Sequence, residues 1–467
     1  MTGSVPLSPP GVAQGAAGPD APVGHLRALA FGTGSVAAAT FNVTPQLWLL
    51  FFLTETLSVP AAWAGLAVLV PKAWEFLFDP AVGWLSDRAR ARHGVRWPWL
   101  LAGAVLFPGA FMALFGPPVF ADWRWTLGWV TGAFLLATSA YSIFAIPFVA
   151  LPGEVSRDPA VRTRVVAWRM AFVGVGVLMA GGLAPVLVEQ GGGGRAGFAH
   201  MAGVLSVVCT LTMLLAAMAA RGFPRQAPVH GGSGGGSGDG SGAPGDRALA
   251  LLLANRAYRW LWGAYLLQMV AIAVTAAMLP YAVTHVMGAP ADHAALLFVA
   301  MTLGSIFTMP LWTWARRRMG TLPAYGAATL LCVAGSVALY DVVLASLPLA
   351  CLAAFLAGVG QAGQQLLPFA LLPAVTERSG GPHADPLRHG GLFAGVWVAG
   401  EKLGLALGGA LAGLLLGLAG YVEGGQGQAP GVVAWIPVLF ALVPAGIFLV
   451  SLLPLRLLDR LAPGLGD

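Results

Sequence analysis

The sequence contains very little charge. Only 9% of its 467 residues are Asp, Glu, Lys or Arg, whereas soluble globular chains carry about 25%. So few charged side chains cannot cover a surface that faces water, and a soluble protein is excluded. Cysteine is also scarce: three residues, all within apolar stretches, exclude a disulfide framework and a cysteine-based metal site. The formal charge of +6 does not indicate a nucleic-acid partner, because the arginines lie in short segments between apolar stretches.

Hydrophobic residues are correspondingly abundant, at 57% of the chain with a mean hydropathy of +0.77. The apolar runs are long and continuous, which is typical of membrane-spanning helices and not of alternating barrel strands. We therefore predict an all-α membrane protein with twelve transmembrane helices in two six-helix bundles, the layout of the major facilitator fold. The predicted spans are 27–53, 61–84, 99–119, 127–151, 165–188, 198–220, 257–286, 293–315, 323–344, 349–372, 391–418 and 432–456.

A Gly/Ser-rich segment, "GGSGGGSGDGSGAPGD", separates the sixth and seventh predicted spans. Such a composition forms a flexible linker and cannot bury a core. The predicted organisation is a disordered cytoplasmic tail (1–24), an N-terminal bundle (25–220), a cytoplasmic linker (221–255), a C-terminal bundle (256–456) and a second cytoplasmic tail (457–467). The first tail has no basic segment before an apolar one, so we do not interpret it as a cleaved signal.

Arginine placement predicts the orientation in the membrane. Seventeen arginines fall in loops on the side of the termini, and only Arg124 and Arg195 fall in loops on the other side. Positive residues favour the cytoplasmic side. We therefore expect a multi-pass protein of the cell (plasma or inner) membrane with both termini in the cytoplasm.

Six charged residues remain inside the predicted spans: Lys72, Glu75, Asp79, Arg169, Glu401 and Lys402. Each costs about 2.5–3.5 kcal/mol at the centre of a spanning helix, and such residues usually face the bundle interior and carry function. At about 100° per residue, Lys72, Glu75 and Asp79 share one helix face. Two carboxylates with one lysine favour a site for one cation, either H⁺ or Na⁺. We predict that the other charged residues, Lys72, Arg169, Lys402 and Glu401, form the coupling charge network. The six charges sum to zero, so purely structural ion pairs are the alternative.

At these residues the chain resembles a known family. "WEFLFDPAVGWLSDRARARHGVRWPWLL", "IPFVALPGEVSRDPAVRTRVVAWRMAF" and "FAGVWVAGEKLGLALGGAL" are similar to motifs of the glycoside–pentoside–hexuronide:cation symporters, the melibiose-carrier branch of the major facilitator superfamily. The resemblance implies that Glu75 and Asp79 bind the coupling cation and that Lys402 links the cation and sugar sites. It implies a place near the sugar for Arg169. It also implies a cytoplasmic gate loop comprising Asp87, Arg88, Arg92 and Arg96.

The sequence also departs from the family pattern. Melibiose-type carriers have two acidic residues that bind the sugar, and these align with Ala39 and Ala145. Lys72 stands where the family usually has arginine. Phe78 stands where the family has a polar residue, immediately before Asp79, the second acid of this span. One possible Na⁺ ligand is therefore missing, which favours the proton as the coupling cation. Ser142 is left as a possible oxygen donor.

The substrate cavity needs polar or aromatic side chains from the spans. The candidates are Gln361, Gln364, Gln365, Trp397, Asn42 and Tyr141. Each could equally serve helix packing or an interhelical hydrogen bond. Three glutamines within one turn of an apolar helix are the strongest of these candidates, because their amides need partners.

Together these features favour cation-coupled symport, driven by H⁺ or Na⁺, of a sugar or related small solute. We expect alternating access, no cofactor and a functional monomer in the lipid bilayer. The alternative is a carrier of a lipid-like or amphipathic compound, working as an exporter. A membrane enzyme or a receptor is a third class, for which no catalytic motif is visible.

Overall fold

The computed structural model describes residues 24–153, 155, 158–223, 255–290, 292–342, 346–377, 386–425 and 427–461. Most of the predicted N-terminal tail and linker, and residues 462–467 of the C-terminal tail, lie outside these ranges. All regular secondary structure in the described residues is helical. Twelve helical spans are long and apolar enough to cross a membrane, which confirms the predicted number.

The N-terminal half holds the first six spans. They are α1 (His25–Gly32), α2 (Gly34–Phe51) and η1 (Phe52–Thr56) for span 1; α3 (Ala61–His93); α4 (Trp97–Phe115); α5 (Trp123–Ala150) with η2 (Leu151–Gly153); α6 (Pro159–Leu178), η3 (Met179–Leu183) and α7 (Ala184–Gln190) for span 5; and α8 (Gly194–Arg221).

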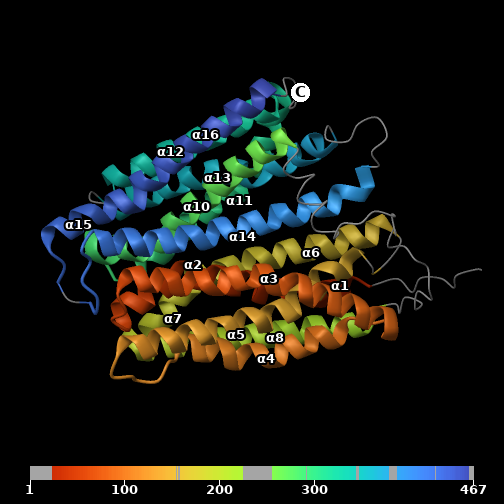
Figure 1. Ribbon diagram of the computed structural model, residues 1–467, viewed down its shortest axis with the longest axis horizontal. Coiled ribbons are helices and arrows are strands. Elements are labelled where there is room, and N and C mark those ends of the chain that lie inside the picture. The colour runs from red at the N-terminus through yellow and green to blue at the C-terminus, as the bar shows by residue number, and fades with distance from the viewer. Residues whose placement is uncertain are drawn as a thin grey trace, which may run out of the picture.

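The C-terminal half holds the other six. They are α10 (Arg256–Tyr281) with η4 (Ala282–Val286) for span 7; α11 (His293–Met319); α12 (Thr321–Val342); α13 (Leu347–Glu377); α14 (Pro386–Leu418); and α15 (Pro430–Pro437), η5 (Val438–Leu442) and α16 (Val443–Leu461) for span 12. Figure 1 shows the two halves side by side, the first running from red to yellow-green and the second from green to blue.

Polar side chains fix where several spans begin. The carboxylate of Asp122 accepts a hydrogen bond from Arg124 N at the start of α5, and Asp158 does the same for Ala160 N at α6 (both 2.8 Å). The side chain of Asn255 accepts from Tyr258 N (2.9 Å) at the start of α10. These caps satisfy backbone donors that the first turn of a helix leaves free.

The second span is longer than predicted. The sequence analysis ended it at residue 84, where the apolar run stops, but α3 continues to His93. Its last turns are charged and leave the apolar stretch, because helix continuation depends on backbone hydrogen bonds and not on hydropathy. Gly94, at φ 70°, ends the helix in the left-handed conformation that glycine adopts readily.

The two halves meet where α3 begins and where spans 1, 7 and 11 end; we call this the closed end. A Cβ atom on Gly65 of α3 would lie 2.8 Å from Ala410 O, and one on Gly413 of α14 would lie 2.6 Å from Ala61 O. Only glycine permits this approach, so α3 and α14 pack backbone against backbone. A Cβ atom on Gly181 of η3 would collide with the ring of Phe298 in α11.

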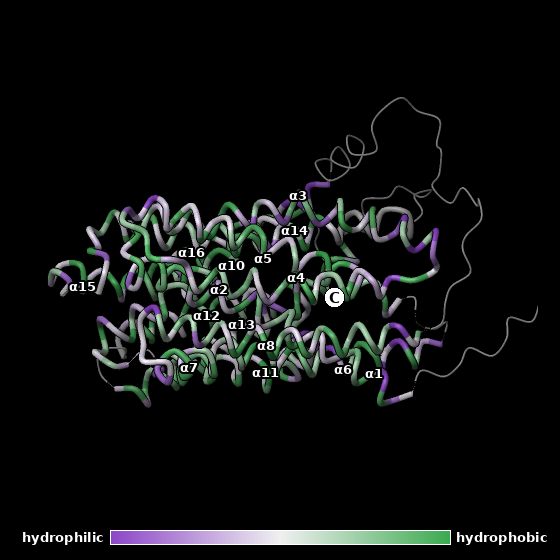
Figure 2. The backbone as a smooth tube through the Cα atoms, turned by 90° about the horizontal axis from the view of Figure 1, so that it is seen from below, coloured by the Kyte–Doolittle hydropathy of each residue, from purple (hydrophilic) through white to green (hydrophobic). Residues whose placement is uncertain are grey.

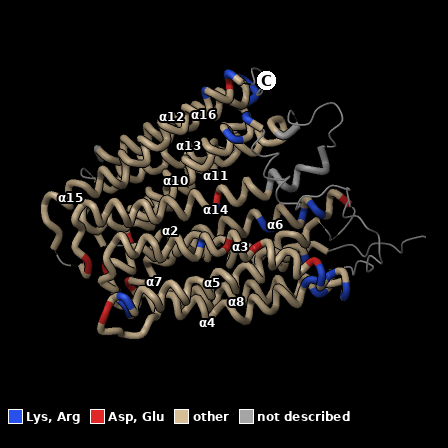
Figure 3. Tube along the Cα trace, viewed as in Figure 1, with Lys and Arg blue, Asp and Glu red and all other residues tan. Residues whose placement is uncertain are grey.

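Hydropathy and charge follow the expected membrane arrangement. Figure 2 shows hydrophobic residues along the length of the spans. In Figure 3 most Lys and Arg residues gather at the end of the bundle opposite the closed end, and a few charged residues lie midway along α3 and α14. These central charges are therefore the feature that needs a functional explanation.

Candidate functional site

Four charged side chains form one cluster between the halves. Lys72 Nζ lies 2.8 Å from Glu75 Oε1 within α3. Lys402 of α14 reaches across from the other half: its Nζ lies 3.3 Å from Glu75 Oε2 and donates a hydrogen bond to Asp79 Oδ2. The three α3 residues share a face because they are three and four positions apart on the helix. The cluster is therefore a charged contact between the two halves.

This cluster lies away from water. The Glu75 side chain is completely buried, and the side chains of Asp79 and Lys402 are 16% and 27% exposed. Two lysines balance two carboxylates, so the cluster is neutral as a whole. Removing one partner of a buried ion pair typically lowers the stability of a protein by about 3–5 kcal/mol. Any process that neutralises a carboxylate here must therefore change how strongly Lys402 holds α3.

Oxygen atoms without hydrogen-bond partners lie in this region. Asp79 Oδ1 is buried and accepts no hydrogen bond from the described residues, and the Ser142 hydroxyl on α5, the span that packs against α3, also has no partner among them. Phe78 stacks on Trp74 with ring centroids 5.6 Å apart and supplies no oxygen. In the described part of the chain no three His, Cys, Asp or Glu side chains gather as a metal site. The two carboxylates are thus the main ligands available to a cation.

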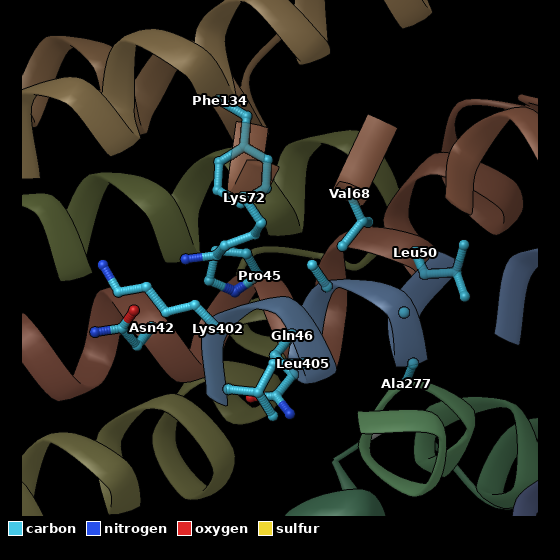
Figure 4. Close-up of a pocket in the computed structure, with 12 residues that line it drawn as sticks. Asn42, Pro45, Gln46, Leu50, Val68, Lys72, Phe134, Ala277, Lys402 and Leu405 are labelled. Atoms are coloured by element: carbon cyan, nitrogen blue, oxygen red, sulfur yellow. The ribbon is translucent and has the colours of Figure 1, made fainter. Parts of the chain in front are cut away.

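The cluster borders a cavity between the halves, with about 540 Å³ of space when its opening is included. Its polar lining is Asn42, Gln46, Lys72 and Lys402. Figure 4 shows these side chains together with the Phe134 ring and the apolar Val68, Leu50 and Leu405. The cavity thus presents cations and amides on one part of its wall and an apolar surface on another.

One of the predicted cavity residues lines this cavity, and a second is hydrogen-bonded to it. Asn42 lines the cavity directly, and its Nδ2 donates a hydrogen bond to the Tyr141 hydroxyl (2.8 Å). Tyr141 is buried on α5. Asn42 Nδ2 also donates to Ala38 O (2.9 Å), so both N–H groups are engaged and the amide oxygen is the atom available to a solute.

The other predicted cavity residues lie elsewhere in the C-terminal half. Gln361 lines a separate cavity with Cys332 and Phe448, while Gln365 is exposed. Gln364 is fully buried, and neither atom of its amide has a hydrogen-bond partner in the described structure. The three glutamines are thus not brought together in one cavity.

Three more predicted residues make their main contacts with aromatic side chains. Trp397 is fully buried and stacks on Tyr265 with ring centroids 4.4 Å apart. Glu401 faces the Tyr265 hydroxyl. The Arg169 guanidinium lies 4.5 Å from the centroid of the Phe148 ring, and its Nε has no hydrogen-bond partner among the described residues. Arg169 is therefore a buried cation held by an aromatic face.

The predicted gate-loop residues lie mostly on helix. Asp87, Arg88 and Arg92 belong to the last turns of α3, and only Arg96 follows it. Arg96 is buried and donates hydrogen bonds to the Asp87 carboxylate and to Ser86 Oγ, the latter at 3.0 Å. The short turn after α3 is thereby tied back to the helix, while Arg92 is exposed.

Sequence reasoning missed the aromatic wall of the cluster. Lys72 Nζ lies 5.5 Å from the centroid of the Phe41 ring and 5.8 Å from that of Phe134. It also missed the apolar lining, although helical spacing could have indicated it. Val68 is four residues before Lys72, and Gly409 is seven residues after Lys402, so each shares a face with a cluster lysine.

The twelve-span bundle with a charged cavity between two halves defines a major facilitator transporter. The chain belongs to the family described as MFS/sugar transport protein, whose model matches residues 30–459. It is thus a secondary transporter of the symporter type.

Curated relatives agree with this family. The chain is 26% identical over 430 residues to Inner membrane symporter YicJ of Escherichia coli K12, covering 91% of this chain and 89% of that protein. It is 27% identical over 437 residues to Putative glycoside/cation symporter YagG of the same organism, covering 90% of each. It is also 26% identical over 438 residues to Sphingosine-1-phosphate transporter MFSD2B of Mus musculus, covering 90% of this chain and 86% of that protein.

Among solved structures, a bacterial homolog of the human lysosomal transporter Spinster in an inward-facing conformation matches with a TM-score of 0.65. The identity is 13%, and the match covers 93% of this chain and 96% of that one. At this identity the likeness establishes the fold alone.

Proposed function

We propose that this protein couples the movement of H⁺ or Na⁺ to the uptake of a sugar or a related small solute, by alternating access. The observation that carries the proposal is the contact of Lys402, in one half, with Glu75 and Asp79 in the other, at the wall of the cavity. A cation on the carboxylates competes with Lys402 for them. Cation binding therefore alters both the contact between the halves and the charge that a solute meets.

Coupling follows from this shared position. Lys402 lines the cavity and binds the carboxylates, so a solute that contacts Lys402 changes the affinity of Glu75 and Asp79 for the cation. By linkage, the cation must change the affinity for the solute by the same factor. A proton needs only a carboxylate, whereas Na⁺ needs several oxygen ligands, for which Ser142 and water would have to supplement the two acids.

The charge distribution supports a cytoplasmic location for the arginine-rich end. Positive residues favour the cytoplasmic side of a membrane, and most Lys and Arg residues lie opposite the closed end in Figure 3. The closed end then faces away from the cytoplasm, in the plasma or inner membrane, with both termini in the cytoplasm. The site lies within a single chain, which supports a functional monomer.

A second cargo class is supported by the cavity lining. Ala39 and Ala145 stand where melibiose-type carriers have acids, and one wall of the cavity is apolar, formed by residues such as Leu50, Val68 and Leu405. MFSD2B, named as a sphingosine-1-phosphate transporter, is among the relatives. A lipid-like compound with a polar head at the lysines and an apolar chain against this wall is therefore the alternative substrate, and export the alternative direction.

The test is uptake into vesicles that contain the wild-type protein or Asp79→Asn. Labelled sugars and a labelled lysophospholipid are offered under an imposed pH gradient, an imposed Na⁺ gradient, or neither. We expect gradient-driven accumulation of at least one sugar by the wild type and loss of that accumulation in Asp79→Asn. Accumulation of the lysophospholipid alone would show that the substrate is an amphiphile and not a sugar. Equal accumulation by both proteins would refute the cation role of Asp79.

A further inference from the structure

A second acid–base contact joins the halves at the closed end. His285 Nε2, in η4 at the end of span 7, lies 3.3 Å from Glu55 Oε1, in η1 at the end of span 1. The same nitrogen is hydrogen-bonded to the Tyr421 hydroxyl at 2.9 Å, from the segment after α14. The side chains of His285 and Glu55 are only 16% and 12% exposed. The mechanism proposed for the central cluster does not use them.

The two residues occupy corresponding places in the two halves. The first span of each half ends in a five-residue π-helical turn, η1 in one half and η4 in the other. Glu55 is the fourth residue of η1 and His285 the fourth of η4, and each follows a threonine. Equivalent positions in the two halves thus carry an acid and a base that meet at the closed end.

Other polar contacts support this meeting point. Thr54 Oγ1 and the Tyr281 hydroxyl are 2.6 Å apart, and Gly424 N donates to Thr54 O (2.9 Å). Glu423 Oε1 accepts from Ala61 N (3.1 Å) at the start of α3. The cluster therefore ties the ends of spans 1 and 7 to the segment after span 11 and to the start of span 2.

The charged and titratable groups around His285 are few. They are Glu55, Tyr421, Tyr281 beside it in the same span, and Glu423 in the segment that carries Tyr421. Glu189 lines a recess with Glu55 and Thr284. The α15 segment, which packs against η4, contains no titratable side chain. Histidine is the side chain in this set that ordinarily changes charge between about pH 5 and 8.

We propose that Glu55, His285 and Tyr421 form a proton-sensitive latch that holds the closed end shut. A protonated His285 attracts the Glu55 carboxylate of the other half, so protonation favours the conformation in which the two are in contact. Loss of that proton as the pH rises weakens the contact and favours opening. The glycine seam of α3 with α14 and the contact of Gly181 with Phe298 carry no charge and do not respond to pH. The Glu423 carboxylate that accepts from Ala61 N ordinarily stays ionised above about pH 5.

The latch concerns the gate at the closed end and not the cargo, so its test requires no substrate. Spin labels are placed at Val119→Cys and Ala429→Cys, exposed positions at the closed end of the N- and C-terminal halves, with the three native cysteines replaced by alanine. Pulsed electron–electron distance measurements are made on the protein in lipid nanodiscs, at about pH 8 and about pH 5.5. A short-distance population reports a shut end and a long-distance population an open one.

We expect the ratio of shut to open molecules to rise about two- to tenfold on acidification. His285→Gln and Glu55→Gln should each abolish that rise, and His285→Lys should keep the end shut at both pH values. His293→Gln is the matched control, because His293 pairs with Asp292 (3.0 Å) at the same end but within one half; it should respond as the wild type does. A pH-independent ratio in the wild type, or an unchanged response in both Gln variants, would overturn the latch. Gel filtration of each variant establishes that it is folded.

Discussion

Two charged clusters connect the same two halves at different depths. The central cluster pairs lysines with Glu75 and Asp79 beside the cavity, whereas the cluster at the closed end pairs His285 with Glu55. Lysine ordinarily keeps its charge throughout the physiological pH range and histidine does not. The central contact can thus be broken by a cation that occupies the carboxylates, and the outer contact by loss of a proton from the imidazole. In the mechanism that we propose, the first contact serves coupling and the second serves gating.

The largest effect is expected from removing the cation that spans the halves. Lys402→Met leaves Asp79 without an ion-pair partner, and an uncompensated buried charge typically costs 3–5 kcal/mol. Because Asp79 is partly exposed, we expect a loss of about 2–3 kcal/mol in stability and loss of all gradient-driven uptake. Thermal unfolding in detergent measures the first effect, and vesicle uptake the second.

The control for that variant is the double change Asp79→Asn with Lys402→Met, which removes both partners. It should recover much of the lost stability, since no charge is left unpaired, without recovering coupled uptake. A double variant as unstable as the single one would mean that Lys402 acts through packing and not through its charge.

A smaller effect is expected at the uncharged seam of the closed end. Gly413→Val places a side chain against Ala61 O, so α3 and α14 must separate, at a typical cost of about 1–3 kcal/mol. The shut population should fall at every pH while its pH dependence persists, as measured with the Val119/Ala429 label pair. Gly132→Val is the control, because a Cβ there meets nothing within 4 Å. Equal shifts in both variants would exclude a specific role for the seam.

The smallest effect is expected at Glu401. It is adjacent to Lys402 in sequence and lies within reach of its charge, but its carboxylate lies at the Tyr265 hydroxyl and makes no ion pair with Lys402 among the described residues. Glu401→Gln should therefore change the cation dependence of uptake by no more than about twofold, an effect of the size of an exposed pair. A change as large as that of Asp79→Asn would place Glu401 inside the coupling network, as the sequence analysis expected.

The features set by local sequence were predictable. The number of spans follows from runs of apolar residues, and the shared face of Lys72, Glu75 and Asp79 follows from helical periodicity. The family resemblance implied a link from Lys402 to the cation site, which spacing alone could not give because the two helices are more than 300 residues apart in sequence. Contacts between distant helices depend on packing that no single segment encodes.

The features that escaped prediction depend on that packing. The prediction places the three glutamines of α13 in one cavity. Successive residues of a helix point about 100° apart, however, and the surrounding helices bury Gln364 while Gln365 stays exposed. Glu55 and His285 stand near the ends of apolar runs, and the sequence analysis makes no prediction for either. Their meeting depends on two π turns and on the closeness of spans 1 and 7, which are visible only in three dimensions.

The most direct measurement compares two transport modes of Asp79→Asn in the same vesicles: accumulation driven by a cation gradient, and exchange of labelled for unlabelled solute at equilibrium. If Glu75 and Asp79 hold the coupling cation while Lys402 and Asn42 meet the solute, accumulation is lost and exchange persists at a rate within about tenfold of the wild type. Gradient-driven accumulation by Asp79→Asn at the wild-type level would contradict the assignment of the cation to these carboxylates.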